Sequence, residues 1–229
     1  DWLGQLPQGA ARRTLALRMR LRAAQGGGQT RQALETARLL AKHRAFSPAA
    51  AQSILRGLAL ELLNEAHDAA QLQCAWASLD ERERAMPELV IHAAARLMAL
   101  QGDAALARAW LLPVWERMLA PQGDLDEGLR IRLIHVLQLG LESLDAPWLA
   151  RIESAQTSHA GDATLAYLAG MACLSRQLWG KAHQLLAQAA PALQDRTLHR
   201  NAWRALALLA EQRGDEAAAV EAYRQAAQL

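Results

Sequence analysis

The chain has 229 residues, enough for one large domain or two small ones. Hydrophobic residues make up 52% of it and aromatic residues only 4%, and Val, Ile and Thr are sparse beside Ala, Leu, Gln and Arg, which predicts an all-α fold. The net charge of +2 does not by itself indicate a polyanionic partner, and no apolar run approaches the ~18 residues of a transmembrane helix. Cys74 and Cys173 form no CxxC pair, so we expect neither a disulfide framework nor a zinc site but two buried thiols.

The N-terminal part of the chain is strongly basic. Residues 12–44 contain nine basic residues and one acid, Glu35, so this segment carries a net charge of +8 and the rest of the chain −6. Two interpretations stay open: a face that lies against anionic lipid head groups, at about 1 kcal/mol per basic residue, or a solvated face. Nucleic-acid binding is not expected, because the whole chain has little net charge and no basic motif interleaved with aromatic residues.

Helix breakers divide the chain at regular intervals, and the segments between them show helical periodicity. Ser47 before Pro48 predicts an N-cap followed by proline at the first helical position. Asp103 and Asp215 each follow a glycine that can end the preceding helix. The breakers are "QGGGQ" at 25–29, "SP" at 47–48, "AMP" at 85–87, "QGD" at 101–103, "PQGD" at 121–124, "HAGD" at 159–162 and "RGD" at 213–215.

A repeat emerges when the small residue early in each second helix is used as a marker. The markers are separated by 39, 35, 39, 36 and 37 residues. A repeat of this length made of two helices predicts a helical solenoid, here of about six hairpins in a single domain over residues 1–229. The markers are Ala33, Leu72, Ala107, Ala146, Ala182 and Ala219.

The pattern within each unit resembles the tetratricopeptide repeat, which has a large residue at position 4, small residues at 8 and 20, Tyr or Phe at 24 and Ala at 27. The last unit matches it with Trp203, Ala207, Ala219, Tyr223 and Ala226. The third and fifth units match in part, whereas the second and fourth are degenerate. The resemblance implies a right-handed superhelix with a concave inner face.

The stretch "LWGKA" at 178–182 has two possible readings, a ligand-binding loop or the turn into a second helix. A phosphate-binding loop needs a preceding strand and more glycines. We therefore expect Gly180 and Lys181 to begin a second helix and Trp179 to cover apolar surface at the corner.

Four stretches together resemble the HemY family of bacterial haem-biosynthesis-associated proteins: "RRTLALRMRLRAAQGG" (12–27), the run from "WASLDERERAMP" to "ALARAWL" (76–111), "LWGKAHQLL" (178–186) and "LALLAEQRGDEAAAVEAYRQ" (206–225). The resemblance implies two transmembrane helices upstream in the bacterial inner membrane, followed by a soluble repeat region on the cytoplasmic side. Because the chain begins at Asp1 rather than Met, we expect it to be the C-terminal part of that region. The family is linked to a late step of protohaem synthesis.

In tetratricopeptide arrays, positions 5 and 9 of each first helix face the concave groove, and this register gives the candidate binding residues. Arginine pairs bidentately with carboxylates, so such a groove would suit an acidic peptide or the propionates of a porphyrin. A third possibility is that another part of the same chain occupies it. The candidates are Arg18, Arg22, Glu61, His92, Arg96, His135, Tyr167 and Arg204.

Catalysis is not expected. The sequence has no HExxH motif, no nucleophile elbow and no GxGxxG turn of a flavin- or nicotinamide-binding domain, and we expect no metal and no obligatory cofactor. We therefore expect a non-enzymatic scaffold that binds partner proteins such as haem-pathway enzymes and that would accept haem or a porphyrin on its concave face. The alternative is a generic tetratricopeptide adaptor for chaperone or secretion complexes.

Overall fold

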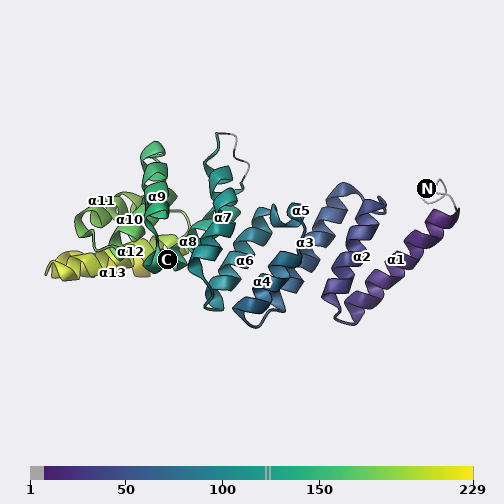
Figure 1. Cartoon of the computed structure of the whole chain (residues 1–229). Helices are drawn as coiled ribbons and strands as arrows, with labels where there is room; N and C mark the ends of the chain where they lie inside the picture. Colours follow the sequence, from purple (N-terminus) through teal and green to yellow (C-terminus); the bar gives the residue numbers. More distant parts are fainter. Residues whose placement is uncertain (1–7, 122, 124, 229) are drawn as a thin grey trace. The chain divides into compact units, whose positions relative to one another are not determined.

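The computed structural model describes residues 8–121, 123 and 125–228, and all regular structure in this part of the chain is helical. Within these residues, thirteen α-helices and two short 3-10 helices follow one another (Figure 1). The predicted all-α class is thereby confirmed. The chain divides into two compact units, Asp1–Gly102 and Asp103–Leu229. A single solenoid over the whole chain stays a prediction.

Unit 1 consists of helices that pack on their neighbours in sequence: α1 on α2, α2 on α3, and both α3 and α4 on α6. The predicted cap of α3 is present, because Ser47 accepts a hydrogen bond from the backbone N–H of Ala50 and Pro48 is the first helical residue. Gly28, in the predicted glycine-rich loop, has a φ of 64°, which favours glycine. The helices are α1 (Gln8–Gly26), α2 (Thr30–Lys42), α3 (Pro48–Asn64), α4 (Ala69–Ser78), α5 (Glu81–Arg84) and α6 (Pro87–Ala99).

Unit 2 is organised around α10, which contacts α8, α9, α11 and α12, while α13 packs on α12. The helical pairs α10–α11 and α12–α13 are closely packed hairpins, and α11 also contacts α12. The elements are α7 (Ala104–Leu119), α8 (Glu127–Leu139), η2 (Leu141–Ser143), α9 (Ala146–Ser158), α10 (Ala163–Ser175), α11 (Trp179–Ala189), η3 (Ala190–Ala192), α12 (Arg196–Gln212) and α13 (Glu216–Ala227).

Aspartate begins most helices of unit 2. Each of these carboxylates accepts a backbone N–H of the first turn, which satisfies a donor that has no partner within the helix. The negative charge also interacts favourably with the positive end of the helix dipole. Of the glycines predicted to end the helices before Asp103 and Asp215, Gly214 has a left-handed φ of 72°, whereas before Asp103 the left-handed residue is Gln101 and not Gly102. The capping residues are Asp103, Asp126, Asp145, Asp162, Asp195 and Asp215.

The repeat markers occupy a constant position in five of the six second helices. In α2, α4, α7, α11 and α13 the marker is the fourth helical residue, and all five are buried. The exception is Ala146, which is the first residue of α9 and is exposed. The fourth residue of α9 is Leu149. Leu149 is only half-buried, so the fourth unit has no buried marker at this position and the assignment of Ala146 as a marker is wrong.

The expectation of two buried thiols is half right. Cys173 is buried in α10, and burial raises the pKa of its thiol. Cys74 is exposed on α4, one residue before the buried Ala75 and Trp76. A residue of an amphipathic helix can lie next to buried residues in sequence and still point to solvent.

Two glycines of one hairpin should respond oppositely to replacement by alanine. A Cβ at Gly170 in α10 would lie 2.7 Å from Cγ of Leu186 in α11, whereas a Cβ at Gly180 would meet nothing within 4 Å. We expect Gly170→Ala to destabilise unit 2 by about 1–3 kcal/mol because the two helices must move apart. Gly180→Ala should be neutral or stabilising by up to about 1 kcal/mol because alanine favours the helix. Urea unfolding of the two variants measures both effects, and equal shifts would contradict the close contact.

Candidate functional site

In unit 1 the structure brings two of the five predicted groove residues together. His92 Nε2 lies 2.8 Å from Oδ1 of Asn64, the last residue of α3, and Arg96 donates hydrogen bonds to the backbone oxygens of Asn64 and Ala66. Both side chains reach from α6 to the end of α3. These two candidates therefore already have partners within unit 1.

The other three candidates of unit 1 differ in their internal contacts and in the exposure of their side chains. Arg18 donates a 2.8 Å hydrogen bond to the backbone oxygen of Ala45, and its guanidinium lies 5.8 Å from the centroid of the Phe46 ring. Arg22 on α1 and Glu61 on α3 are exposed. Only these last two present most of their side chain to solvent.

In unit 2 the three candidates have different surroundings. Tyr167 is fully buried and donates a 2.7 Å hydrogen bond to Oε1 of Gln138. This hydrogen bond links α10 to α8. His135 Nε2 lies 3.4 Å from Oδ1 of Asp195, the N-cap of α12. Arg204 is exposed on α12. The repeat register predicted that Tyr167 contacts a ligand in the groove. In the structure its hydroxyl instead contacts Gln138 within unit 2.

Burial has a measurable consequence for Tyr167. Burial raises its pKa to about 12, even though its hydrogen bonds with Asn201 and Gln138 act in the opposite direction. An unfolded tyrosine ionises near pH 10. The stabilising contribution is therefore complete below about pH 10 and is lost as the pH rises to about 12, because the unfolded chain loses its proton first.

We expect the free energy of unfolding to fall by roughly 3 kcal/mol between about pH 10 and pH 12 through Tyr167 alone. Tyr167→Phe should remove this part of the pH dependence, although it leaves Gln138 without its donor. The comparison is urea unfolding of both proteins at intervals across this range. Parallel pH profiles for the two proteins would contradict the assignment.

Arginines that reach the end of a neighbouring helix recur in both units. The accepting carbonyls belong to the last residue of a helix or to one of the three residues that follow it. The negative end of the helix dipole favours a cation near such a position. Sequence reasoning missed this role because it needs to know which helix end is near. The hydrogen bonds run from Arg18 to Ala45 O, Arg38 to Ser78 O, Arg96 to Ala66 O, Arg108 to Gly140 O and Arg176 to Leu144 O.

Residues that sequence reasoning did not select form an open groove of about 610 Å³ between α7 and α9. Its lining includes Trp115 and Leu119 of α7 and Pro147 and Ala155 of α9. Trp115 and Trp148 pack edge to face with their ring centroids 5.8 Å apart. Both rings are buried and pack between the two helices, and Trp115 also forms part of the base of the groove.

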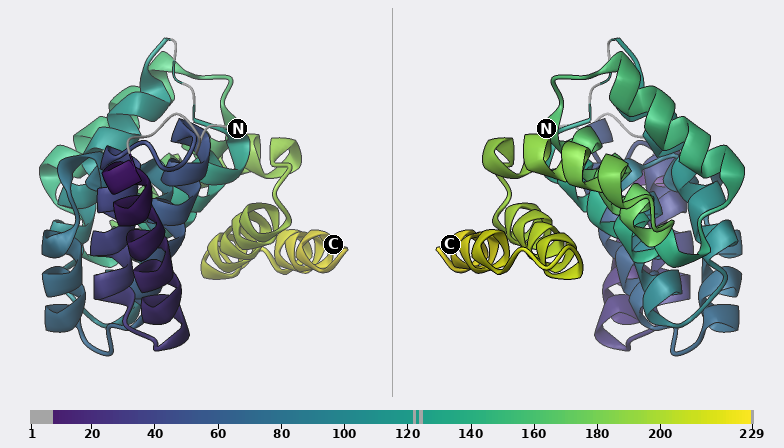
Figure 2. Two further views of the ribbon diagram at one scale, coloured as in Figure 1. Left: turned by 90° about the vertical axis from the view of Figure 1, so that its right-hand side faces the viewer. Right: turned by 90° about the vertical axis from the view of Figure 1, so that its left-hand side faces the viewer.

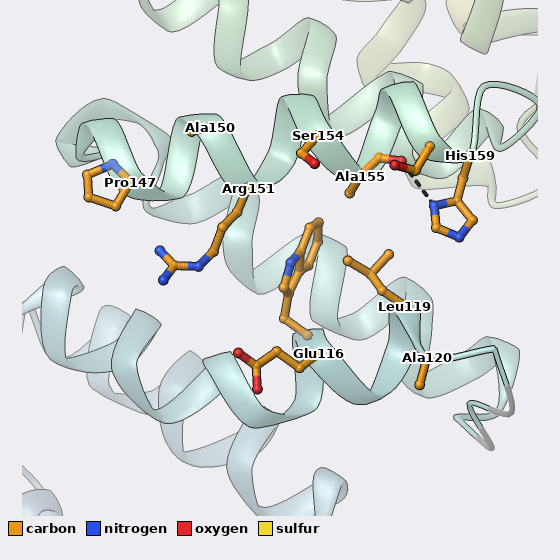
Figure 3. Close-up of a pocket in the computed structure, with 11 residues that line it drawn as sticks. Glu116, Leu119, Ala120, Pro147, Ala150, Arg151, Ser154, Ala155 and His159 are labelled. Carbon is orange, nitrogen blue, oxygen red and sulfur yellow. Dashed lines mark hydrogen bonds between the residues drawn. The ribbon is translucent and has the colours of Figure 1, made fainter.

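Charged and polar side chains stand around this apolar base. Arg151 reaches from α9 and Glu116 from α7 into the space between the helices (Figure 3). The guanidinium of Arg151 also lies 5.8 Å from the centroid of the Trp148 ring, which holds it by a cation–π contact. At the other end His159 lies with its Nδ1 3.1 Å from the backbone oxygen of Ala155. Such a groove can receive an apolar side chain together with a carboxylate that pairs with Arg151.

The stretch "LWGKA" starts a second helix, as predicted, because α11 begins at Trp179. Lys181 donates a 2.7 Å hydrogen bond to Oε1 of Glu153 on α9. This bond is the main reason why the pKa of Lys181 is raised. The lysine therefore links α11 to α9 in the described structure.

Among the residues that the structure describes, no group of three or more His, Cys, Asp or Glu could hold a metal ion. Within that part of the chain no helix is both long and apolar enough to span a membrane.

The chain was compared with protein-family models, with curated proteins and with solved structures, and none of the three comparisons finds a match.

Proposed function

We propose that the chain is a tetratricopeptide-like module that binds partner proteins and performs no catalysis. The observation that carries this proposal is the buried marker at the fourth residue of five second helices. A small or apolar residue at a constant helical position lets successive hairpins pack in the same way, as in repeat proteins that bind peptides. A right-handed superhelix is the arrangement that this repeat would produce.

The groove between α7 and α9 is the part of unit 2 best suited to a partner. Its base is apolar and held by two packed tryptophans, while Arg151 and Glu116 provide opposite charges at its edges. A peptide segment with one large apolar side chain and a neighbouring carboxylate would satisfy both features. In unit 1, exposed Arg22 and Glu61 remain available for contacts on the predicted concave face.

The biological setting that we propose is late haem synthesis, on a protein anchored upstream in the bacterial inner membrane with this region in the cytoplasm. The support is the resemblance of four stretches to the HemY family, of which "LWGKAHQLL" falls within α11 and the turn before it. The exposed arginines of α1, among them Arg12, Arg13 and Arg20, would suit a position near anionic head groups.

A pull-down tests the partner proposal. Full-length protein carrying Ser154→Arg would place a long side chain in the groove, since Ser154 is exposed and lines it. Thr157→Arg is the matched control, because Thr157 is exposed on the same helix but does not line the groove. We expect wild type and Thr157→Arg to recover a haem-pathway enzyme and Ser154→Arg to lose it. Recovery of chaperone or secretion components instead would favour the generic adaptor.

Porphyrin binding is the second branch of the proposal and has its own test. The purified chain is titrated with protohaem, and the Soret band is followed for wild type, His92→Ala and His135→Ala. A histidine ligand to the iron would shift the band in wild type and not in the corresponding variant. No shift in wild type, or a shift unchanged in both variants, would remove this branch and leave the partner proposal untouched.

A further inference from the structure

The outer edge of unit 2 carries exposed apolar side chains from two adjacent helices. Helix α13 packs on α12 at this edge (Figure 2). The exposed fractions are 51% for Leu208 on α12, and 68% and 40% for Val220 and Tyr223 on α13. Exposed apolar side chains gathered on two packed helices are typical of a surface that binds another protein.

Charged residues flank this apolar surface in a definite order. Arg204, Leu208 and Glu211 lie four and three residues apart on α12, so they form one stripe along the helix, and all three are exposed. The positive and negative ends are separated by seven residues, or roughly 10 Å along the axis. Leu208 lies close to the midpoint between them.

Tyr223 shows that the stripe and α13 share one face. Partial burial and the neighbouring Glu211 carboxylate raise the pKa of Tyr223, and Arg204 acts in the opposite direction. The Tyr223 hydroxyl forms a side-chain hydrogen bond with Glu211, and α13 packs on α12, so Tyr223 lies beside the stripe. The surface is therefore continuous across the two helices; we call it the terminal face, defined by Arg204, Leu208, Glu211, Val220 and Tyr223.

We propose that the terminal face binds the terminal face of a second copy of this chain, with the two α12 helices antiparallel about a twofold axis near Leu208. This arrangement places Arg204 of each copy opposite Glu211 of the other and buries the two leucines between the two pairs. A twofold interface requires a surface that is complementary to itself, and the order positive, apolar, negative has this property.

The charge balance favours a second copy over a strongly charged partner. Arg204 and Glu211 are of opposite sign, and the nearby Arg224 already pairs with Glu221 at 2.6 Å within α13. The face thus has no excess of either charge that would attract nucleic acid or anionic lipid. Leu208, Val220 and Tyr223 supply the apolar centre that a protein interface needs.

Charge reversal tests the proposal. The mass of the chain in solution is measured as a function of concentration for wild type, Arg204→Glu, Glu211→Arg, the double variant and an equimolar mixture of the two single variants. We expect a dimer for wild type and association at least about tenfold weaker for each single variant, because each creates two like-charge contacts. The double variant and the mixture should both restore the dimer, since each brings opposite charges together again.

The control is Arg132→Glu, an equal charge reversal at an exposed position of α8. Circular dichroism of every variant checks that the exposed substitutions leave the helices intact. A wild type that stays monomeric to about 100 μM would overturn the proposal, a concentration above the dissociation constants of most specific dimers. Single variants that dimerise like wild type, or a mixture that stays monomeric, would overturn it as well.

Discussion

Arg38→Met is expected to destabilise unit 1 by about 3–5 kcal/mol, the effect of leaving a buried carboxylate without its cation. Arg38 on α2 binds the Glu83 carboxylate through two parallel hydrogen bonds, Nε to Oε1 at 2.9 Å and Nη2 to Oε2 at 2.5 Å. The Glu83 side chain is only 1% exposed. The hydrogen bond to Glu83 is also the largest of the influences that raise the pKa of Arg38.

Two further variants separate the pair from general disruption. Arg38→Met together with Glu83→Met removes both charges, and we expect it to cost less than Arg38→Met alone. Arg56→Met is the matched control, because Arg56 and Glu88 form a 2.8 Å pair whose side chains are both partly exposed, and an exposed pair contributes about 0–1 kcal/mol. Urea unfolding followed by circular dichroism gives the three free energies. Equal losses for Arg38→Met and Arg56→Met would refute the buried pair.

Local patterns in the sequence were sufficient to predict the all-α class and the approximate spacing of the second helices. The marker residues can be recognised in the sequence because a position where two helices pack closely favours small or apolar side chains. Ala182 and Ala219 are examples, and both are buried. The same reasoning placed a marker at Ala146, which is exposed at the start of α9, because the 3-10 turn before that helix leaves no periodic signal in the sequence. Spacing therefore predicts a repeat but not the insertions within it.

The contacts of the candidate site residues were harder to predict, because a long side chain can reach a partner that is distant in the sequence. The register gives the face of the helix on which Arg96 begins, but not that its guanidinium reaches the end of α3. Tyr167 was assigned to a groove, although its hydroxyl lies against Gln138. In both cases the partner is about thirty residues away, and a pattern within one helix contains no information about it.

The groove between α7 and α9 depends on the same kind of distant contact. Trp115 and Trp148 belong to different units of the repeat, and neither occupies a position that the tetratricopeptide pattern prescribes. Large aromatic residues on two second helices were the signal that could have indicated the contact. Their spacing of 33 residues is close to one repeat, so the two rings can meet when adjacent units pack.

Trp115→Ala is expected to destabilise unit 2 by about 3–5 kcal/mol, as is usual when a buried indole is replaced by a methyl group. Trp115 is 2% exposed and packs against Trp148, so the change leaves a cavity and removes the edge-to-face contact. Trp115→Phe should cost less, because a smaller ring still fills part of the space.

Trp179→Ala is the matched control for this substitution in the same unit. Trp179 is 41% exposed at the start of α11, so its removal should cost at most about 1 kcal/mol. Thermal and urea unfolding of the three variants measure the differences. Comparable losses for Trp115→Ala and Trp179→Ala would show that the tryptophan pair does not hold α7 against α9. If instead only Trp115→Ala loses stability, and Trp115→Phe retains binding of the partner recovered by wild type, then the rigid base of the groove is what the partner requires.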